Sequence, residues 1–192
     1  MTNYTDRQKQ IIQVSLDLIA NSGIHGLTIK NISKKVGITE PAIYRHFDSK
    51  SDILMGVISK VKESSGVDLF TLENKTLTTK KLILKAFTTR AQRFTKNPSI
   101  AAVIFSEAIF ENDSVLSGAI TSIMGESHMK MVKIIKRGQG KGEIVDFIKA
   151  DQLALMIIGA FRLLVTKWHM SNNSFDLIMR TKSMVNAFEQ LI

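Results

Sequence analysis

The chain contains very few residues that force a helix to end, and this constrains its fold more than any other feature. Pro41 and Pro98 are its two prolines, and its eleven glycines gather mainly at 23–26, 37 and 138–142. Between these breaks apolar residues recur every three or four positions, whereas the alternation that is typical of strands does not extend over any useful length. The sequence therefore predicts an all-α protein with about nine helices.

The apolar spacing and the helix-capping residues predict where the helices lie. We expect a helix over 6–21, ending at Ser22 and Gly23, and a short helix that Thr28 caps. After a turn at Gly37, Thr39 is expected to cap a second short helix of about two turns, with Pro41 in its first turn, where a missing N–H has no cost. Longer helices are expected over 49–64, 80–96, 99–110, 113–137, 149–170 and 174–191, with a flexible loop at 138–142.

Composition limits the kinds of partner and the compartment. Twenty-six Lys and Arg against seventeen Asp and Glu give a net charge of +9, which favours a polyanionic partner or an anionic membrane surface. The chain has no cysteine, so disulfides and cysteine-bound zinc are excluded, and a reducing cytoplasm suits it. No secretory signal is expected at the N-terminus, and the longest apolar run, 153–161, is too short to predict a membrane span. We expect a soluble cytoplasmic protein that does not enter a membrane.

Two short helices joined by a glycine turn form a helix-turn-helix pattern. The segments Gly23–Thr28, Ile32–Ser33, Val36–Thr39, Ala42–Phe47 and Ser49–Leu54 together resemble the DNA-binding domain of the tetracycline-repressor (TetR) family. The similarity covers residues 7 to about 54 and combines many positions of mixed chemistry at fixed spacing, which makes it more specific than a bare helix-turn-helix. It implies a three-helix DNA-binding domain at 1–48 and a larger helical effector-binding and dimerisation domain at 49–192, with 49–64 as connecting helix.

The second short helix presents the side chains that would contact DNA. Thr39, Glu40, Pro41, Tyr44 and Arg45 stand at its start and on its outer side, where a recognition helix meets base edges. The resemblance implies that Glu40, Pro41, Tyr44 and Arg45 approach bases and that the phosphate backbone is contacted by Thr28, Ala42, His46 and Lys50, while Lys30 adds to the basic cluster.

Several of these positions also allow a purely structural interpretation. Tyr44 and His46 are compatible with ordinary half-buried helix residues. Glu40 either accepts a hydrogen bond from cytosine or only stabilises the helix N-terminus, and Pro41 either touches a thymine methyl or stiffens the cap. The operator sequence does not follow from these residues.

A helix-turn-helix protein reads two half-sites about 34 to 36 Å apart, or a multiple of that, when it forms a two-fold dimer. We therefore expect a homodimer on a palindromic operator in double-stranded DNA, with the interface on the last two helices. The expected interface residues are Leu153, Met156, Ile157, Ala160, Leu164, Ile178, Val185 and Phe188. The alternative is that these apolar stripes fill the core of the subunit itself.

The family resemblance also implies an effector cavity in the larger domain. Bulky apolar side chains and polar residues on the same helices are candidates to line it, although such apolar stripes more often form core. The candidates are Phe87, Arg90, Phe94, Phe105, Met124, His128, Phe161, Arg162 and Trp168. The predicted function is a transcriptional repressor that a small apolar or amphipathic effector releases from its operator.

Other classes of protein explain fewer of the residues. An enzyme lacks support because the four histidines are scattered and the glycines of 138–142 neither follow a strand nor precede a Lys-Ser/Thr pair. A metal site formed by His128 and His169 with a carboxylate is a weak alternative, and no metal or cofactor is expected. The basic residues near 130–137 form too short a stretch for a membrane-surface helix. Additional binding of a protein partner stays open.

Overall fold

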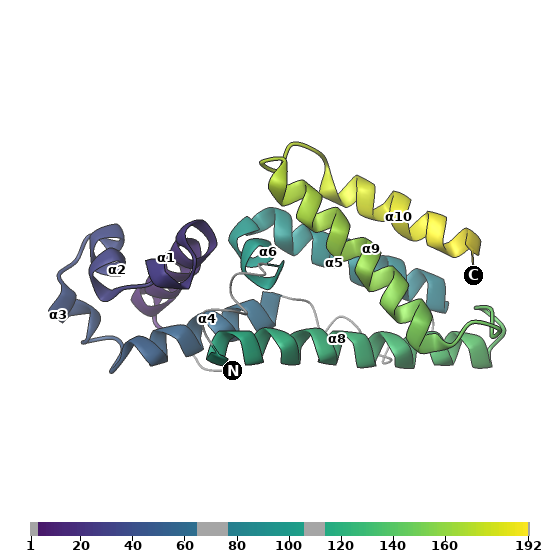
Figure 1. Ribbon diagram of the computed structural model, residues 1–192, viewed down its shortest axis with the longest axis horizontal. Coiled ribbons are helices and arrows are strands. Elements are labelled where there is room, and N and C mark those ends of the chain that lie inside the picture. The colour runs from purple at the N-terminus through teal and green to yellow at the C-terminus, as the bar shows by residue number, and fades with distance from the viewer. Residues whose placement is uncertain (1–3, 65–76, 106–113, 192) are drawn as a thin grey trace.

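The computed structural model describes residues 4–64, 77–105 and 114–191, and every regular element in these ranges is a helix (Figure 1). The all-α prediction is confirmed for this part of the chain. The helices are α1 (Asp6–Ser22), the short 3₁₀ helix η1 (Ile24–Gly26), α2 (Ile29–Val36), α3 (Glu40–Ile43), α4 (Lys50–Ser64), α5 (Thr79–Lys96), α6 (Pro98–Phe105), α8 (Ser114–Gly140), α9 (Ala150–Met170) and α10 (Leu177–Leu191).

The N-terminal helices form a small unit at one end of the molecule (Figure 1). Thr5 begins α1 with a capping box, in which its hydroxyl accepts from the Gln8 backbone N–H and the Gln8 side chain accepts from the Thr5 backbone N–H. Gly37 ends α2 in the left-handed conformation, at φ 77°, and donates to the Ser33 carbonyl. Because this turn reverses the chain within a few residues, α3 lies directly beside α2.

The recognition helix is shorter than the sequence suggested. Only Glu40–Ile43 are helical, and the chain continues through turns to Phe47. The helix is therefore one turn long where about two were expected. Its cap also differs from the prediction, because Thr39 has the extended backbone of a cap but its hydroxyl makes no capping hydrogen bond. Pro41 has no N–H to donate to that hydroxyl, and the Ala42 N–H donates to the Thr39 carbonyl at 3.0 Å instead. Such bonds between residues three apart wind the chain more tightly than an α-helix does.

The long α4 joins this unit to the larger domain. Ser49 caps it by accepting from the Asp52 N–H at 3.1 Å while its hydroxyl donates to the Asp52 carboxylate at 2.8 Å. A side chain at buried Gly56 would place its Cβ 2.8 Å from Cδ1 of Ile12 on α1, so glycine permits the close approach of these two helices. In the larger domain α10 packs along α5, and α9 packs on α8, α10 and α6 (Figure 1).

The predicted glycine loop begins later than expected. Helix α8 continues past Arg137 to Gly140, and Gly138 is buried, where a Cβ would lie 2.8 Å from Ile144 and from Thr79. The loop is hydrogen-bonded, since the Gln139 side chain donates to the carbonyls of Val145 and Ile148 at 2.8 Å each. Gly138 therefore belongs to a packed helix end, where glycine permits close contact, whereas residues 140–142 are exposed.

Two other helix boundaries differ from the prediction. Helix α6 is described only to Phe105, and the rest of the expected helix 99–110 lies outside the described residues. Helix α10 begins at Leu177, three residues later than expected, because the Asp176 carboxylate accepts from the Met179 N–H at 2.9 Å and so sets the start.

Helix α9 differs from the expectation that no segment is long and apolar enough to span a membrane. Among the described residues it is the one helix long and apolar enough to cross a membrane, by length and composition alone. Core helices of soluble proteins meet the same criterion, and α9 packs on three other helices. Only 33% of this apolar stretch is buried, so packing within the subunit accounts for part of its apolar character and leaves an apolar face exposed.

Candidate DNA-binding and effector sites

The ten residues predicted to contact DNA lie together on the N-terminal unit, on α2, on α3 with the turns after it, and at the start of α4. Buried Ile43 and Phe47 attach the recognition segment to the unit, so its outer side chains are held in fixed positions. Ala42 and His46 are half-buried, and the other eight are exposed: Thr28, Lys30, Thr39, Glu40, Pro41, Tyr44, Arg45 and Lys50.

Hydrogen bonds orient several parts of this surface. The Thr28 hydroxyl accepts from the Asn31 N–H at 3.1 Å and so starts α2. The His46 carbonyl accepts from the Gln8 side chain at 2.9 Å, which ties the end of the recognition segment to α1. Lys50 is the first residue of α4, where N–H groups of the helix end and its own ammonium group favour a phosphate. Residues 1–62 contain nine Lys and Arg against five Asp and Glu, so the unit suits a polyanion.

A polar network joins α1 to the start of α6 and was not predicted from the sequence. The Asp17 carboxylate accepts from the Ser99 hydroxyl at 2.6 Å and from the Gln13 amide at 2.9 Å. The Asn97 amide donates to the Gln13 side-chain oxygen at 2.8 Å. We call these four residues the α1–α6 network. It links the DNA-binding unit directly to the larger domain.

A second polar contact joins α4 to α8. The Lys62 ammonium donates to the Glu126 carboxylate at 2.8 Å and holds the pKa of that carboxyl below its ordinary value. Both side chains are partly exposed, so the pair contributes little to the free energy of folding.

Five of the predicted effector residues form an aromatic cluster between α5, α6 and α9. The ring centroids of Phe87 and Phe161 lie 4.9 Å apart, those of Phe94 and Phe161 lie 6.1 Å apart, and those of Phe94 and Phe105 lie 5.9 Å apart. The guanidinium carbon of Arg90 lies 5.8 Å from the centroids of both Phe94 and Phe161. Arg90 is 4% exposed, and its burial lowers its pKa to about 10. The site therefore combines an apolar interior with one buried cation.

The remaining predicted effector residues lie around the cluster or away from it. The guanidinium carbon of Arg162 lies 5.7 Å from the Phe105 ring centroid, and Trp168 is buried. Met124 is half-buried against the core, and half-exposed His128 has its Nε2 3.6 Å from the Asp151 carboxylate. Close to Phe105 lies a cavity of about 190 Å³, which is smaller than the 300–1,000 Å³ of ordinary ligand pockets. A bulky effector would therefore require the rings to move.

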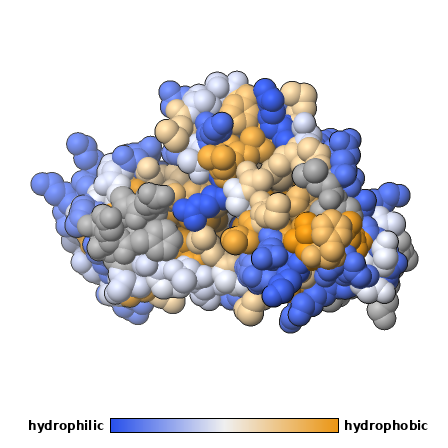
Figure 2. Space-filling view, turned by 45° about the vertical axis from the view of Figure 1, so that its right-hand side comes forward, coloured by the Kyte–Doolittle hydropathy of each residue, from blue (hydrophilic) through white to orange (hydrophobic). Residues whose placement is uncertain are grey.

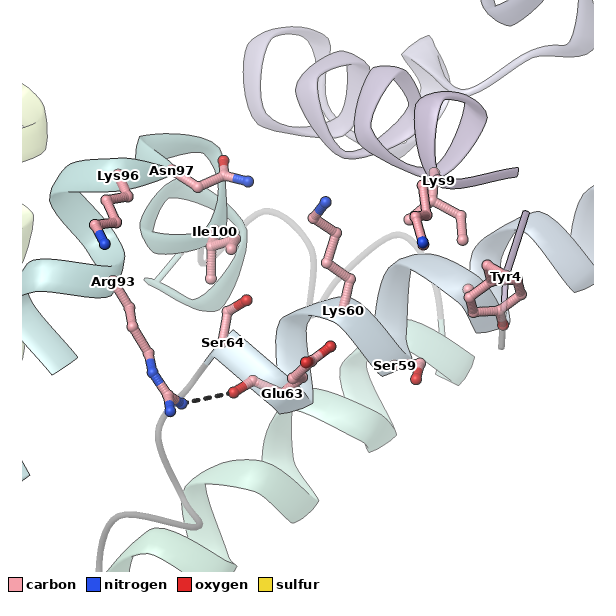
Figure 3. A pocket seen from close by; sticks show the side chains of 12 residues that line it. Tyr4, Lys9, Ser59, Lys60, Glu63, Ser64, Arg93, Lys96, Asn97 and Ile100 are labelled. Carbon is pink, nitrogen blue, oxygen red and sulfur yellow. Dashed lines mark hydrogen bonds between the residues drawn. The ribbon is translucent and has the colours of Figure 1, made fainter. Parts of the chain in front are cut away.

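A larger groove lies between the two domains and was not foreseen. Its volume is about 810 Å³, and α1, α4, α5 and α6 line it (Figure 3). We call it the interdomain groove. Its charged residues are Lys9, Lys60, Glu63, Arg93 and Lys96, and its other lining residues are Tyr4, Ile12, Gly56, Ser59, Ser64, Asn97 and Ile100. No sequence motif marks it, because its residues come from four helices.

The predicted dimer residues divide between the interior and the surface. Within the subunit Leu153, Ile157, Val185 and Phe188 are buried, so their side chains belong to its own core and offer almost no surface to a second subunit. Leu164 and Ile178 are half-buried, and Met156 and Ala160 are exposed. The outward stripe of α9, which we call the α9 face, consists of Leu155, Met156, Gly159, Ala160 and Leu163.

The α9 face is unusually apolar for a surface. Leu155 is 65% exposed, Met156 54% and Leu163 58%, and Met179 on α10 is 60% exposed. A side chain at Gly159 would meet no atom within 4 Å, so the backbone there is open to close approach. Figure 2 shows hydrophobic side chains gathered in patches between hydrophilic ones on the face that it presents. Contiguous exposed apolar area of this kind is typical of an interaction surface.

A helix-turn-helix unit on a helical domain with an aromatic interior defines a DNA-binding regulator with a ligand-binding domain. Comparison with known proteins identifies the family to which this regulator belongs. Residues 11–56 match the model of the bacterial regulatory proteins of the tetR family, and residues 58–191 match that of the YsiA-like protein, C-terminal region. The chain belongs to the tetR family, and it is a DNA-binding transcriptional regulator.

Relatives with stated roles cover most of the chain. The nucleoid occlusion factor SlmA of Aliivibrio fischeri is 29% identical over 164 residues, which are 81% of this chain and 82% of that protein. The fatty acid metabolism regulator protein of Bacillus subtilis is 26% identical over 178 residues, 92% of this chain and 90% of that protein. The crystal structure of FadR from Bacillus subtilis in complex with stearoyl-CoA has the same fold, with a TM-score of 0.77, 24% identity and coverage of 96% and 98%.

Proposed function

We propose that this protein is a cytoplasmic, homodimeric transcriptional repressor that a long-chain acyl-CoA releases from a palindromic operator. The observation on which the effector depends is the aromatic cluster around Arg90. The rings of Phe87, Phe94 and Phe161 form an apolar interior that suits a long acyl chain, and the Arg90 guanidinium among them is a hydrogen-bond donor for a thioester carbonyl oxygen. The similarity to a fatty acid metabolism regulator supports this class of ligand.

The DNA-binding role falls to the exposed residues of the N-terminal unit. Glu40, Pro41, Tyr44 and Arg45 contact bases in the major groove in this proposal. Phosphates are bound by Thr28, Lys30, Thr39, Ala42, His46 and Lys50, through side chains and backbone N–H groups. The free hydroxyl of Thr39, which caps no helix, suits a phosphate oxygen.

The dimer forms through the α9 face and the adjoining surface of α10. Met156 and Ala160 stay in this interface from the sequence prediction, and Leu155, Gly159 and Leu163 join them. Large apolar side chains that are more than half exposed gain free energy when a second copy covers them, and a two-fold axis pairs the face with itself. The interface therefore sets the distance between the two recognition segments.

Effector binding changes that distance. Ligand that enters among Phe87, Phe94 and Phe161 moves α5 and α9 apart, because the 190 Å³ cavity beside Phe105 does not hold a long acyl chain. Helix α6 packs on α9 and is joined to α1 by the α1–α6 network, so the movement reaches the DNA-binding unit. The state that binds effector best is then one that fits the operator poorly.

Selection of bound sequences from random duplex DNA gives the operator, its symmetry and its half-site spacing. Fluorescence anisotropy on that operator then measures release by stearoyl-CoA, with sodium stearate and coenzyme A alone as controls. We expect stearoyl-CoA to weaken operator binding by about 5- to 150-fold, the usual range of allosteric coupling. If stearoyl-CoA binds the protein and operator affinity does not change, the proposed induction is wrong.

A further inference from the structure

The interdomain groove has an excess of positive charge that the DNA-binding surface does not explain. Lys9, Lys60, Arg93 and Lys96 face it against a single carboxylate, that of Glu63. Figure 3 shows Lys60 rising from α4 into the space between α1 and α5. Four cations around one concave surface raise the local potential and favour an anion.

Existing contacts leave much of this charge available. Arg93 donates to the backbone carbonyl of Glu63 at 2.8 Å, which holds its guanidinium at the groove wall (Figure 3). The ammonium group of Lys9 lies 3.5 Å from the exposed Asp6 carboxylate, a weak pair. Within the described ranges, neither Lys60 nor Lys96 has an ion-pair or hydrogen-bond partner.

The floor of the groove is apolar, unlike its walls. Ile12, Gly56 and Ile100 are buried there, and half-buried Tyr4 lies at one end. Ile12 and Ile100 are each 2% exposed, and a Cβ at Gly56 would lie 2.8 Å from Ile12, so the half-buried ring of Tyr4 is the aromatic surface that the groove offers. A ligand that fits has a flat ring for the Tyr4 end and phosphate groups for the basic walls, which is the chemistry of a nucleotide.

Position connects the groove to the aromatic cluster. Helix α5 contributes Arg90 and Phe94 to the cluster and Arg93 and Lys96 to the groove, so the two sites share the same turns of this helix on different faces. Helix α6 contributes Ile100 to the groove and Phe105 to the cluster. A ligand with an apolar tail and a phosphorylated head has one part that suits each site.

We propose that the interdomain groove binds the nucleotide portion of an anionic ligand, with phosphates at Lys60, Arg93 and Lys96 and the base against the Tyr4 ring. This inference rests on the proposed function where the nucleotide is the coenzyme A part of the acyl thioester; a free nucleotide is the other source of the same chemistry. The groove volume of about 810 Å³ lies within the range of small-molecule sites.

An occupant of the groove touches both domains at once. Tyr4, Lys9, Ile12 and Lys60 belong to the DNA-binding unit and its connecting helix, whereas Arg93 belongs to the effector domain. Binding therefore selects one angle between the domains, and phosphorylated effectors release DNA more strongly than the acyl chain alone.

The test measures binding of ADP and of stearoyl-CoA by titration calorimetry in the full-length dimer. The double variant Lys60→Gln with Lys96→Gln removes two groove charges, and Lys85→Gln with Lys133→Gln removes two exposed charges elsewhere as the matched control. We expect both ligands to bind about tenfold or more weakly to the groove variant and within twofold of wild type to the control. Glu63→Gln removes the opposing carboxylate and should tighten both about twofold.

The outcomes separate the two proposals. If stearoyl-CoA binds and releases DNA equally well in wild type and groove variant, and ADP does not bind, the groove proposal is overturned and the effector proposal stands. If ADP binds in a groove-dependent way while stearoyl-CoA does not affect DNA binding, the groove holds a free nucleotide and the acyl-CoA effector is wrong. A melting temperature of the lysine variant within about 2 °C of wild type excludes loss of folding as the cause of its weakened binding.

Discussion

Removal of the Asp17 carboxylate tests how firmly the DNA-binding unit is joined to the effector domain. Asp17→Ala deletes the 2.6 Å bond from Ser99 and the 2.9 Å bond from Gln13. The first is a charge-assisted, part-buried bond beside the N-terminus of α6 and contributes about 1.5 kcal/mol. The second joins residues four apart on α1 and contributes about 0.5 kcal/mol. The expected loss of unfolding free energy is about 2 kcal/mol.

This loss is large enough to measure by thermal unfolding. For a chain of this length, each kcal/mol lowers the melting temperature by about 2–4 °C, so Asp17→Ala should melt about 4–8 °C below wild type. The control is Asp6→Ala, which removes the same charge from the same helix but only an exposed 3.5 Å contact with Lys9. It should lower the melting temperature by less than about 2 °C.

A double-mutant cycle identifies the contact itself. Asp17→Ala and Ser99→Ala, separately and together, give the interaction energy between the two side chains, which we expect to be about 1 kcal/mol. An interaction energy below about 0.3 kcal/mol would refute the reasoning, because the two residues would then act independently across the domain boundary.

Three other changes test separate parts of the structure. Ile43→Ala removes a fully buried side chain that anchors the recognition segment and should lower the free energy of unfolding in urea by about 2–5 kcal/mol. Thr39→Ala should change that free energy by less than about 0.5 kcal/mol, because the Thr39 hydroxyl caps no helix. Leu163→Glu places a charge on the α9 face and should convert the dimer to monomer in sedimentation, while Lys133→Glu on the exposed surface of α8 should not; a dimeric Leu163→Glu contradicts the interface. The Glu143 carboxylate accepts from the Thr79 N–H at 2.5 Å, which holds the pKa of Glu143 below the ordinary value. The contribution of this bond to the free energy of unfolding is therefore complete above about pH 4.5 and is lost as the pH falls further. Glu143→Gln should flatten this acidic part of the plot of unfolding free energy against pH, and an unchanged plot contradicts the assignment.

The DNA-binding unit was predictable because its determinants are local. Thr28 and Gly37 do what their positions in the sequence indicate, one as a cap and the other as a left-handed turn. The start of the recognition helix was not predictable from the same rules. Pro41 has no N–H for the Thr39 hydroxyl, and the Ala42 N–H donates to the Thr39 carbonyl instead. Pro41, two positions after Thr39, removes one of the N–H groups that a side-chain cap would use.

The aromatic cluster was predictable in part. Phe87, Arg90 and Phe94 recur on one face of α5, and the 3.6-residue period places them together. Which rings of other helices meet them depends on packing, which brings Phe161 of α9 within 4.9 Å of Phe87 and Phe105 of α6 within 5.9 Å of Phe94. Helix α9 is apolar on several sides, so the spacing alone did not distinguish buried Leu153 from exposed Leu155.

The contacts between domains were beyond sequence reasoning for a physical reason. Asp17 and Ser99 are 82 residues apart, and polar side chains on a helix surface have no periodicity that distinguishes a partner in another helix from water. The interdomain groove has the same character, since Lys60 and Lys96 become neighbours only after α4 and α5 have packed. The residues that each domain contributes to such a site resemble ordinary solvated surface in the sequence. The site exists only where the two domains meet. Control of DNA binding by a ligand requires that junction, so the residues that couple the two domains are those that local sequence patterns describe least.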